Sequence, residues 1–397
     1  MGDVRSVSIL GVTGSVGRAT ADVVKAHRAT MRVHAVTAYR DVAGLARMAM
    51  ELEASVAVIG DDSLYQALKH ALAGTDIRAA AGAQAIEEAA SSPVDVTMAA
   101  IVGVAGLRPV MAAIRRGGVI AIANKEPLVA AGTLIMRAAR RSGATILPVD
   151  SEHNAIFQVF DRDRRGTIEK IILTASGGPF RTWSHAQMES ATPAQAVAHP
   201  NWSMGAKISV DSATMMNKAL EVIEAHYLFD MPADKIDVVI HPQSVIHSMV
   251  SYCDGSVLAQ MGAPDMRTPI AYCLGWPGRC KTPGSFLDVL SAMPALTFEP
   301  PDHTRFPALA LAYDCLESGA ASCLALNAAN EVAVAAFLDG QIGFTEIYSA
   351  VSSCLEKIDR LPLDSIDDVV LSDEAVRRDI LRYIHKDRSA KAAAGHS

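Results

Sequence analysis

The sequence has little of what marks secreted, membrane-spanning or nucleic-acid-binding proteins. Its 397 residues include only six cysteines, none in a CxxC pair. This argues against a zinc or redox site and favours reduced thiols in the cytoplasm. Apolar runs are interrupted by charge before they reach about 18 residues, so no membrane span is predicted. The net charge is −7 and no basic block occurs, so we expect no nucleic-acid partner.

The chain also lacks the basic, apolar and small-residue regions of a signal peptide at its start. Its first apolar run, residues 6–12, is short and ends in a glycine turn, which predicts a β-strand. Half of the residues are apolar, enough to bury more than one core. The composition therefore favours a multidomain globular protein.

Changes in amino-acid composition and pattern along the chain predict the domain organisation. Residues 1–149 alternate β-rich and alanine-rich runs, which is typical of a doubly wound, Rossmann-like α/β domain. Residues 150–275 combine strand-like runs with polar, glycine-containing loops, as in an α+β domain. The proline-rich residues 276–306 indicate a linker. Residues 307–385 indicate a helical bundle and 386–397 a tail.

Regular elements can be placed from periodicity and turn residues. The expected strands are residues 6–12, 31–39, 54–60, 95–101, 117–123 and 144–149, followed by 170–175, 235–242, 244–252 and 256–262. The expected helices near the C-terminus are residues 308–319, 323–340, 344–358 and 372–386.

A glycine-rich turn follows the first expected strand and precedes a helix. Gly11, Gly14 and Gly17 have the spacing GxxGxxG. A strand, glycine turn and helix in this order can direct backbone N–H groups at a pyrophosphate, and Thr13 and Ser15 can add hydroxyl contacts. Because the spacing departs from GxGxxG, a tight turn without a ligand is the alternative.

The end of the second expected strand bears on the choice of nucleotide. An NAD site places an acidic residue about 20 residues after the glycine turn, but here the strand ends in Thr37 and Ala38, with Arg40 beyond. Arginine pairs well with a 2′-phosphate, which favours NADPH. Asp41 beside it would repel that phosphate, and a solvated Arg40 is the alternative.

Two polar segments follow the last strands of this domain. Residues 124–126 (Asn-Lys-Glu) could reach the nucleotide, or form a surface turn. Asp150 and Glu152 are two residues apart, and in an extended segment their side chains leave on the same side. Converging carboxylates are costly unless they hold a cation or a proton, and Mg²⁺ or Mn²⁺ suits an all-oxygen site. A solvated acidic turn is the alternative.

A second cluster lies in the α+β region. Asn217, Lys218 and Glu221 share one face of an expected helix, where they suit a phosphate, a sugar hydroxyl and a metal. An ordinary exposed Lys–Glu pair is the alternative. Ser176 and the two glycines after it form a plausible phosphate cradle.

Residues 196–206 place His199, Trp202 and Met204 in a loop bounded by proline and glycine. This pattern suggests a lid that excludes water from a substrate, although a loop packed on the core would look similar. His241 and His247 lack a third zinc ligand at suitable spacing, so we expect them to be sheet residues.

These segments, taken in order, resemble the blocks of the 1-deoxy-D-xylulose 5-phosphate reductoisomerase family. The blocks are GVTGSVG, ANKEPLV, PVDSEHNAIFQ, TASGGPFR, HPNWSMG, DSATMMNKALE, IHPQSVIHSMV, PDMRTPI and NAANEVAVAAFL. The resemblance implies a homodimer that binds NADPH and one divalent metal, Mg²⁺ or Mn²⁺, with Co²⁺ as a further candidate. It also places the dimer contact in the catalytic domain.

The resemblance further implies roles for individual residues. The cofactor set is Thr13, Gly14, Ser15, Val16, Gly17, Arg40, Asp41, Asn124, Lys125, Glu126, Met204, Gly205 and Met266. The metal set is Asp150, Glu152 and Glu221, which with His199 and Lys218 make up the catalytic set. The substrate set is Ser151, Glu152, Ser176, His199, Trp202, Ser212, Asn217, Lys218 and Glu221.

The reaction implied is rearrangement of 1-deoxy-D-xylulose 5-phosphate followed by reduction to 2-C-methyl-D-erythritol 4-phosphate, in the non-mevalonate route to isoprenoid precursors. Two alternatives remain open from the residues alone. One is an NADP-dependent dehydrogenase of another phosphorylated substrate, and the other is a non-catalytic NADPH sensor.

Overall fold

The computed structural model describes residues 4–202, 204–290, 295–358 and 361–394, with side chains described up to residue 386. The chain forms two compact units. Unit 1 comprises residues 1–127, 135–158 and 265–292, and unit 2 comprises 128–134, 159–264 and 293–397. The first unit therefore takes up three separate stretches of the chain.

Unit 1 is built on a seven-stranded sheet of order β4-β3-β2-β1-β5-β6-β7. All of its strand pairs are parallel. The order reverses direction at β1, and ligands bind at such a switch point in open α/β sheets. The strands are β1 Arg5–Leu10, β2 Met31–Ala38, β3 Val56–Ile59, β4 Arg78–Ala81, β5 Val96–Ala99, β6 Val119–Ile122 and β7 Thr145–Pro148.

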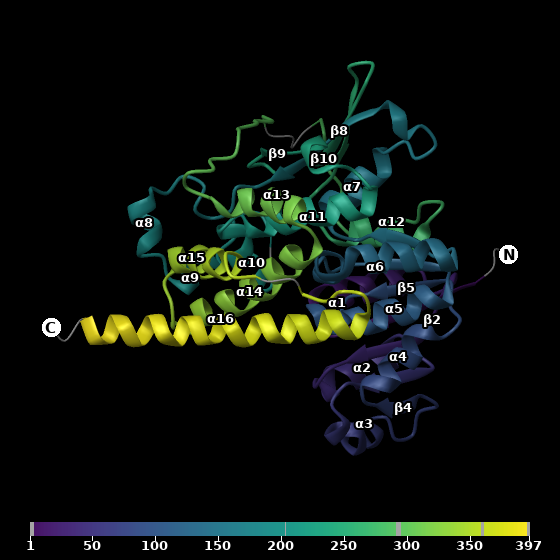
Figure 1. Ribbon diagram of the computed structural model, residues 1–397. Helices are drawn as coiled ribbons and strands as arrows, with labels where there is room; N and C mark the ends of the chain where they lie inside the picture. Colours follow the sequence, from purple (N-terminus) through teal and green to yellow (C-terminus); the bar gives the residue numbers. More distant parts are fainter. Residues whose placement is uncertain (1–3, 203, 291–294, 359–360, 395–397) are drawn as a thin grey trace. The chain divides into compact units, whose positions relative to one another are not determined.

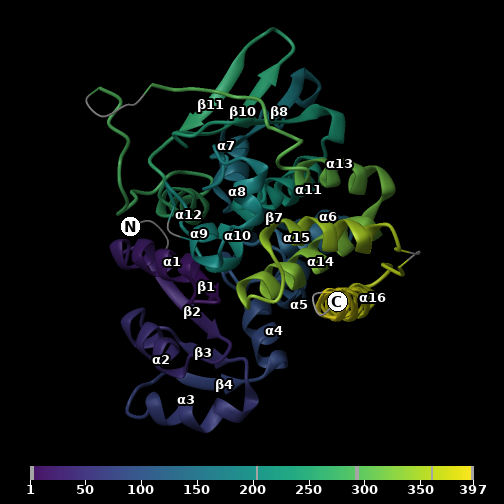
Figure 2. The same ribbon diagram turned by 90° about the vertical axis from the view of Figure 1, so that its left-hand side faces the viewer.

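Helices cover both faces of this sheet, with α1 and α2 on one side and α4 and α5 on the other (Figure 2). Most of these strands are largely buried and rich in valine, isoleucine and alanine, as expected of a parallel sheet, whereas the edge strand β4 is exposed or half-buried. The helices are α1 Ser15–Ala26, α2 Val42–Glu51, α3 Tyr65–Ala71, α4 Ala83–Ser91, α5 Leu107–Arg116, α6 Glu126–Ser142, α7 Ser151–Val159 and α12 Arg267–Gly275.

Unit 2 contains a four-stranded mixed sheet of order β11-β10-β8-β9, of which Figure 1 labels β8, β9 and β10 and Figure 2 labels β11, β10 and β8. The β8–β10 and β10–β11 pairs are antiparallel and β8–β9 is parallel. One edge strand, β11, is mostly exposed. The strands are β8 Ile168–Ala175, β9 Ile236–Ile240, β10 Ile246–Tyr252 and β11 Val257–Met261.

The helices of unit 2 surround a long buried helix, α14. This helix is apolar and long enough to cross a membrane by length and composition alone, but 72% of its apolar window is buried inside the protein. It is therefore a core helix of the unit. The helices are α8 His185–Glu189, α9 Pro193–Ala196, α10 Ala206–Ala213, α11 Met216–Phe229, α13 Ala308–Ser318, α14 Ala320–Leu338, α15 Phe344–Leu355 and α16 Ile366–Ala394.

The predicted fold class is confirmed, and each predicted strand corresponds to an observed one. One observed strand, β4, was not predicted. Its sequence RAAA has low β propensity, and it forms a strand because it pairs with β3. At the other end, α16 continues through the first residues of the expected tail, to Ala394. The expected linker and tail include residues 291–294 and 395–397, which lie outside the described residues.

Candidate active site

The glycine turn between β1 and α1 lies at the switch point of the unit 1 sheet. Gly11 has φ +87°, and a Cβ there would lie 2.6 Å from the carbonyl oxygen of Ala100. A Cβ on Gly17 would lie 2.2 Å from the oxygen of Gly11. Only glycine therefore allows the turn and the close packing of helix on strand, as a pyrophosphate-binding loop requires.

Gly14, the middle glycine of the turn, has a different role from Gly11 and Gly17. Gly14 precedes α1 with no side-chain cap on the helix, and a Cβ there would meet nothing closer than 3.5 Å. The first turn of α1 therefore offers uncapped backbone N–H groups, which favour an anion. Arg18, which the sequence did not single out, donates to the Thr13 carbonyl at 2.6 Å and holds the turn.

Arg40 and Asp41 have separate partners. The Arg40 side chain is 68% exposed, and its Nε lies 2.9 Å from Oδ2 of Asp61. Asp41 is the N-cap of α2, and its Oδ1 accepts from the Gly44 N–H at 2.8 Å. The Asp41 carboxylate is thus turned to its own helix, which leaves Arg40 as the accessible charged group. Asp61, at the end of the neighbouring strand, was not predicted.

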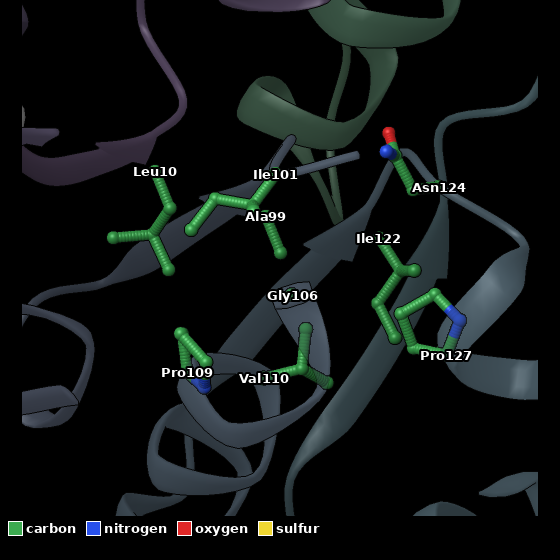
Figure 3. Close-up of a pocket in the computed structure, with 9 residues that line it drawn as sticks. All are labelled: Leu10, Ala99, Ile101, Gly106, Pro109, Val110, Ile122, Asn124 and Pro127. Atoms are coloured by element: carbon green, nitrogen blue, oxygen red, sulfur yellow. The ribbon is translucent and has the colours of Figure 1, made fainter. Parts of the chain in front are cut away.

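A narrow apolar pocket lies at the carboxyl ends of three adjacent strands, β1, β5 and β6 (Figure 3). Asn124 follows β6 beside Ile122 and Pro127 at this pocket. The lining is apolar apart from the Asn124 amide. The residues lining the pocket are Leu10, Ala99, Ile101, Gly106, Pro109, Val110, Ile122, Asn124 and Pro127.

Lys125 forms an ion pair with Asp150. Its Nζ lies 2.6 Å from Oδ2 of Asp150, and both side chains are largely buried. Burial alone would raise the pKa of Asp150, but the charges of Lys125 and His153 hold that pKa well below its usual range. Asp150 is therefore an anion whose charge is balanced by a cation. The sequence suggested a cofactor contact for Lys125, and the ion pair is an additional contact.

Asp150 and Glu152 are brought together by a helix start. A carboxylate oxygen of each lies within 4.8 Å of the other, but β7 ends at Pro148 and α7 begins at Ser151. The expectation that an extended segment aligns them is therefore wrong. Both acids lie at the N-terminal end of α7, where the helix dipole favours negative charge. The Ser151 hydroxyl donates to Glu152 at 2.6 Å.

In unit 2, the side chains of Asn217, Lys218 and Glu221 converge on one face of α11, as their spacing predicts. Asn217 Nδ2 donates to Glu221 Oε1 at 2.5 Å, and Lys218 pairs with Glu221 Oε2. Glu221 is fully buried and Lys218 is 3% exposed. This burial excludes the alternative of an ordinary surface pair.

The Ser176 loop packs against α10. Gly177 and Gly178 both have positive φ, and a Cβ on Gly178 would lie 2.5 Å from the Ser212 carbonyl oxygen. The Gly178 N–H donates to Ser176 Oγ at 3.1 Å. The backbone of the loop at Gly178 and the Ser212 carbonyl are thus in contact.

His199 organises the loop that the sequence suggests as a lid. Its Nδ1 accepts from the N–H groups of Asn201 and Trp202, at 3.2 and 3.0 Å. In the neutral ring Nε2 then carries the hydrogen and donates to Ser176 Oγ at 2.9 Å. Burial lowers the pKa of His199, which favours this neutral form. Ser203, within the same loop, lies outside the described residues.

The remaining residues of the loop have mixed environments. Trp202 is half-buried, with its ring centroid 6.1 Å from that of His247. Met204 is also half-buried, whereas Gly205 is exposed and caps α10. Asn201 anchors the loop by donating to the Pro242 carbonyl at 2.6 Å.

The other histidine of the sheet region is structural, as expected. His241 is fully buried, and its Nε2 accepts from the N–H groups of Val245 and Ile246, each at 3.2 Å. Its Nδ1 pairs with the Thr297 carbonyl at 2.9 Å. Neither ring nitrogen is therefore available as a metal ligand.

Met266, predicted to lie near the nicotinamide, is the N-cap residue of α12 in unit 1. Its neighbours fix this turn, since Asp265 accepts from Arg267 Nη2 at 2.6 Å and from the Ser285 N–H at 3.0 Å. The two flanking residues thus hold Met266 in a defined position within the nucleotide unit.

Comparison with known proteins matches most of the chain to one family. Residues 7–132 match the family model of 1-deoxy-D-xylulose 5-phosphate reductoisomerase. Residues 146–229 match a C-terminal domain of that enzyme, and 261–379 match a DXP reductoisomerase C-terminal domain. The 1-deoxy-D-xylulose 5-phosphate reductoisomerase of Rhodospirillum centenum is 58% identical over 375 residues, covering 94% of this chain and 93% of the relative.

Solved structures lead to the same family. The Zymomonas mobilis reductoisomerase in complex with NADPH is 51% identical and covers 96% of this chain and 99% of its own, with a TM-score of 0.91. A DOX-P reductoisomerase with NADPH, fosmidomycin and magnesium is 42% identical, with coverages of 96% and 98% and a TM-score of 0.92. The chain belongs to the 1-deoxy-D-xylulose 5-phosphate reductoisomerase family.

Proposed function

We infer that this chain rearranges 1-deoxy-D-xylulose 5-phosphate and reduces the product to 2-C-methyl-D-erythritol 4-phosphate, with NADPH and one divalent metal. The reaction belongs to the synthesis of isoprenoid precursors. The observation that carries the inference is the buried Asn217–Lys218–Glu221 cluster on α11. A nucleotide-binding protein without a phosphorylated substrate has no need of it, and family membership names the substrate.

The nucleotide would bind unit 1 along the glycine turn. The tight turn that glycine allows at Gly11 and Gly17, followed by the uncapped start of α1, fits a pyrophosphate. We propose that Arg40 holds the 2′-phosphate and that Asn124 and Met266 contact the nicotinamide side. The remaining proposed contacts are Thr13, Gly14, Ser15, Val16, Asp41, Lys125, Glu126, Met204 and Gly205. When bound, NADPH supplies the hydride.

The metal ligands we propose are Asp150, Glu152 and Glu221. Their oxygen donors match a hard cation such as Mg²⁺ or Mn²⁺. In this structure a lysine ammonium pairs with Asp150 and another with Glu221, so each of these carboxylates already faces a positive charge. When bound, the metal polarises the substrate carbonyl. Glu152 is our candidate for moving the hydroxyl proton of the substrate.

Binding of the substrate phosphate is proposed for Ser176, Ser212, Asn217 and Lys218. The first two lie on the Gly178–Ser212 contact, and the others begin α11. His199 ties the lid to Ser176, so a phosphate at Ser176 would also order the lid and exclude water. Ser151 and Trp202 complete the proposed substrate set.

A homodimer is proposed from the edge of the unit 2 sheet. Val257, Leu258 and Met261 of β11 are 51%, 48% and 36% exposed, and an exposed apolar edge strand is a template for pairing. Light scattering should give a dimer mass, and Leu258→Lys should shift it towards the monomer. A monomeric wild-type chain would reject the dimer.

We also propose a cytoplasmic compartment and an organisation of the chain into domains. All six cysteines are free thiols, which supports a reducing cytoplasm. We retain a nucleotide domain of residues 1–149, a catalytic domain of 150–275, a linker of 276–306 and a helical domain of 307–385. Limited proteolysis should cut first within the linker if these boundaries are right.

The deciding assay follows NADPH oxidation with the ketose phosphate, with and without Mn²⁺. We expect turnover that needs both and a branched polyol phosphate as the product. An unbranched alcohol would favour the simple dehydrogenase, and nucleotide binding without turnover would favour the sensor. Turnover that survives complete chelation would reject the metal ligands proposed above.

A further inference from the structure

A buried carboxylate outside the proposed site residues joins α10 to α14. Asp211 is 1% exposed. Its Oδ1 accepts from Nδ2 of Asn330 at 2.8 Å, and its Oδ2 lies 2.9 Å from Nζ of Lys207. Asn330 is fully buried and lies 119 residues further along the chain. A buried charge needs such partners, so the link fixes α10 to the core helix.

Asp211 immediately precedes Ser212, one of the residues proposed to bind phosphate. The Ser212 carbonyl accepts from the Met215 N–H at 3.2 Å, and the same carbonyl lies against Gly178. A displacement of Asp211 would therefore move Ser212 away from the Ser176–Gly178 loop.

The turn after Ser212 gives a second reason to expect that the position of Asp211 affects the phosphate site. Met215 has φ 62° and ψ 6°, a left-handed conformation that a β-carbon disfavours. Such conformations persist where the surroundings hold them. Asn217 and Lys218 follow this turn, and Thr214 bonds the Asp211 carbonyl at 3.1 Å. The position of Asp211 thus affects both sides of the phosphate site.

We propose that Asp211, held by Asn330, is a positioning residue for binding of the substrate phosphate. Through this pair the helix α14, which contributes none of the proposed substrate contacts, sets the distance between Ser212 and the Gly178 loop. The inference rests on the proposed function, because it takes the phosphate of the ketose phosphate as the ligand.

The test compares Asn330→Ala with Asn327→Ala. Asn327 is a matched control because it is equally buried on α14 but donates to Glu331 of its own helix. Loss of one hydrogen bond to a buried charge corresponds to about a tenfold change. We expect Asn330→Ala to raise the KM for 1-deoxy-D-xylulose 5-phosphate about tenfold, with kcat and the Kd for NADPH within about threefold. Asn327→Ala should change neither KM nor kcat beyond its effect on stability.

A charge exchange provides a rescue. Asn330→Asp places a second carboxylate against Asp211 and should raise KM further. The double variant Asp211→Asn, Asn330→Asp restores one amide and one carboxylate and should return KM towards the wild-type value. Failure of this rescue, or an equal rise of KM in Asn327→Ala, would overturn the positioning role.

Inorganic phosphate separates this inference from the proposed function. If the wild-type chain does not oxidise NADPH with the ketose phosphate, the proposed function fails. The positioning role is then judged by calorimetric binding of inorganic phosphate, which Asn330→Ala should weaken by the same factor and Asn327→Ala should not. Equal phosphate affinity in wild type and Asn330→Ala would reject it.

Discussion

The ammonium of Lys125 lies 2.6 Å from the carboxylate of Asp150, and the two residues follow neighbouring strands, β6 and β7, of one parallel sheet. Because these strands end at the same edge, side chains 25 residues apart in sequence meet there. The ion pair keeps Asp150 ionised despite its burial. A cation that binds Asp150 must therefore share this carboxylate with Lys125 or displace it.

Replacing Lys125 by methionine should strengthen metal binding while harming catalysis. The variant removes a positive charge beside the proposed metal ligand, and Coulomb repulsion at this range corresponds to on the order of tenfold in affinity. Titration with Mn²⁺, followed by electron paramagnetic resonance, measures the Mn²⁺ affinity of the variant and of the wild type. The control is Lys170→Met, which breaks an exposed pair with Asp237. Equal Mn²⁺ affinity in Lys125→Met and wild type would show that Lys125 and the metal do not compete.

Glu221→Gln should weaken Mn²⁺ binding by at least about tenfold. Loss of a residue that only orients a metal ligand already lowers metal affinity by about that factor, so loss of a ligand should lower it at least as much. The amide keeps the shape of the side chain but removes the charge. Activity should fall with metal affinity, while NADPH binding to unit 1 should be unchanged. Glu299→Gln, which affects an exposed pair with Arg181, is the control. Undiminished Mn²⁺ affinity would contradict the assignment.

Two glycine variants should separate packing from nucleotide binding. Gly17→Ala places a Cβ 2.2 Å from a backbone oxygen and should destabilise the protein by about 1–3 kcal/mol even without nucleotide. Gly14→Ala meets no atom closer than 3.5 Å, so its melting temperature should match wild type. It should weaken NADPH binding, because the added methyl lies on the exposed side of the turn. A stable Gly17→Ala would contradict the packing role.

Arg40→Met should lower the preference for NADPH over NADH by about ten- to a hundredfold, the value of a charge-assisted hydrogen bond. Kinetics with both nucleotides measure this ratio. Asp41→Asn should leave it nearly unchanged, because asparagine also caps a helix and the Asp41 side chain already faces α2. Arg47→Met on α2 controls for general charge. A large effect of Asp41→Asn would mean that the charge of Asp41, and not only that of Arg40, sets the preference between the two nucleotides.

Lid anchoring by His199 should be lost in acid. The pKa of His199 is lowered in the folded protein. The stabilisation of the folded lid by the neutral His199 ring is therefore fully present above the unfolded pKa of about 6.5. It is lost as the pH falls through the folded pKa, because a protonated Nδ1 cannot accept from Asn201 and Trp202. Trp202→Phe removes an indole fluorophore, so the Trp202 signal can be isolated by difference. A Trp202 signal that stays constant from pH 8 down to the pH at which the protein unfolds would contradict this.

Much of this architecture could be predicted because the relevant signals are local. The strands of unit 1 are short β-branched runs, and their parallel pairing follows from the helices between them. The face shared by Asn217 and Glu221 follows from a spacing of four residues. Such features depend on neighbours in sequence, so one chain suffices to find them.

The features that were missed depend on distant partners. The RAAA strand forms only because β3 is beside it. Lys125 pairs with Asp150 and Asp211 with Asn330 through folding that no spacing rule reveals. The reason given for the Asp150–Glu152 pair was wrong because the strand ends early and a helix start brings the two together.

The three-part construction of unit 1 also constrains how the chain folds on the ribosome. Arg5, at the start of β1, donates to the carbonyls of Leu274 and Trp276 at 2.5 and 2.6 Å. The first strand therefore leaves the exit tunnel long before these partners, which are 269 and 271 residues away. Vectorial synthesis cannot finish the amino-terminal unit first. A fragment ending at residue 158 would lack α12, so truncation at that point should give an incompletely packed nucleotide-binding unit.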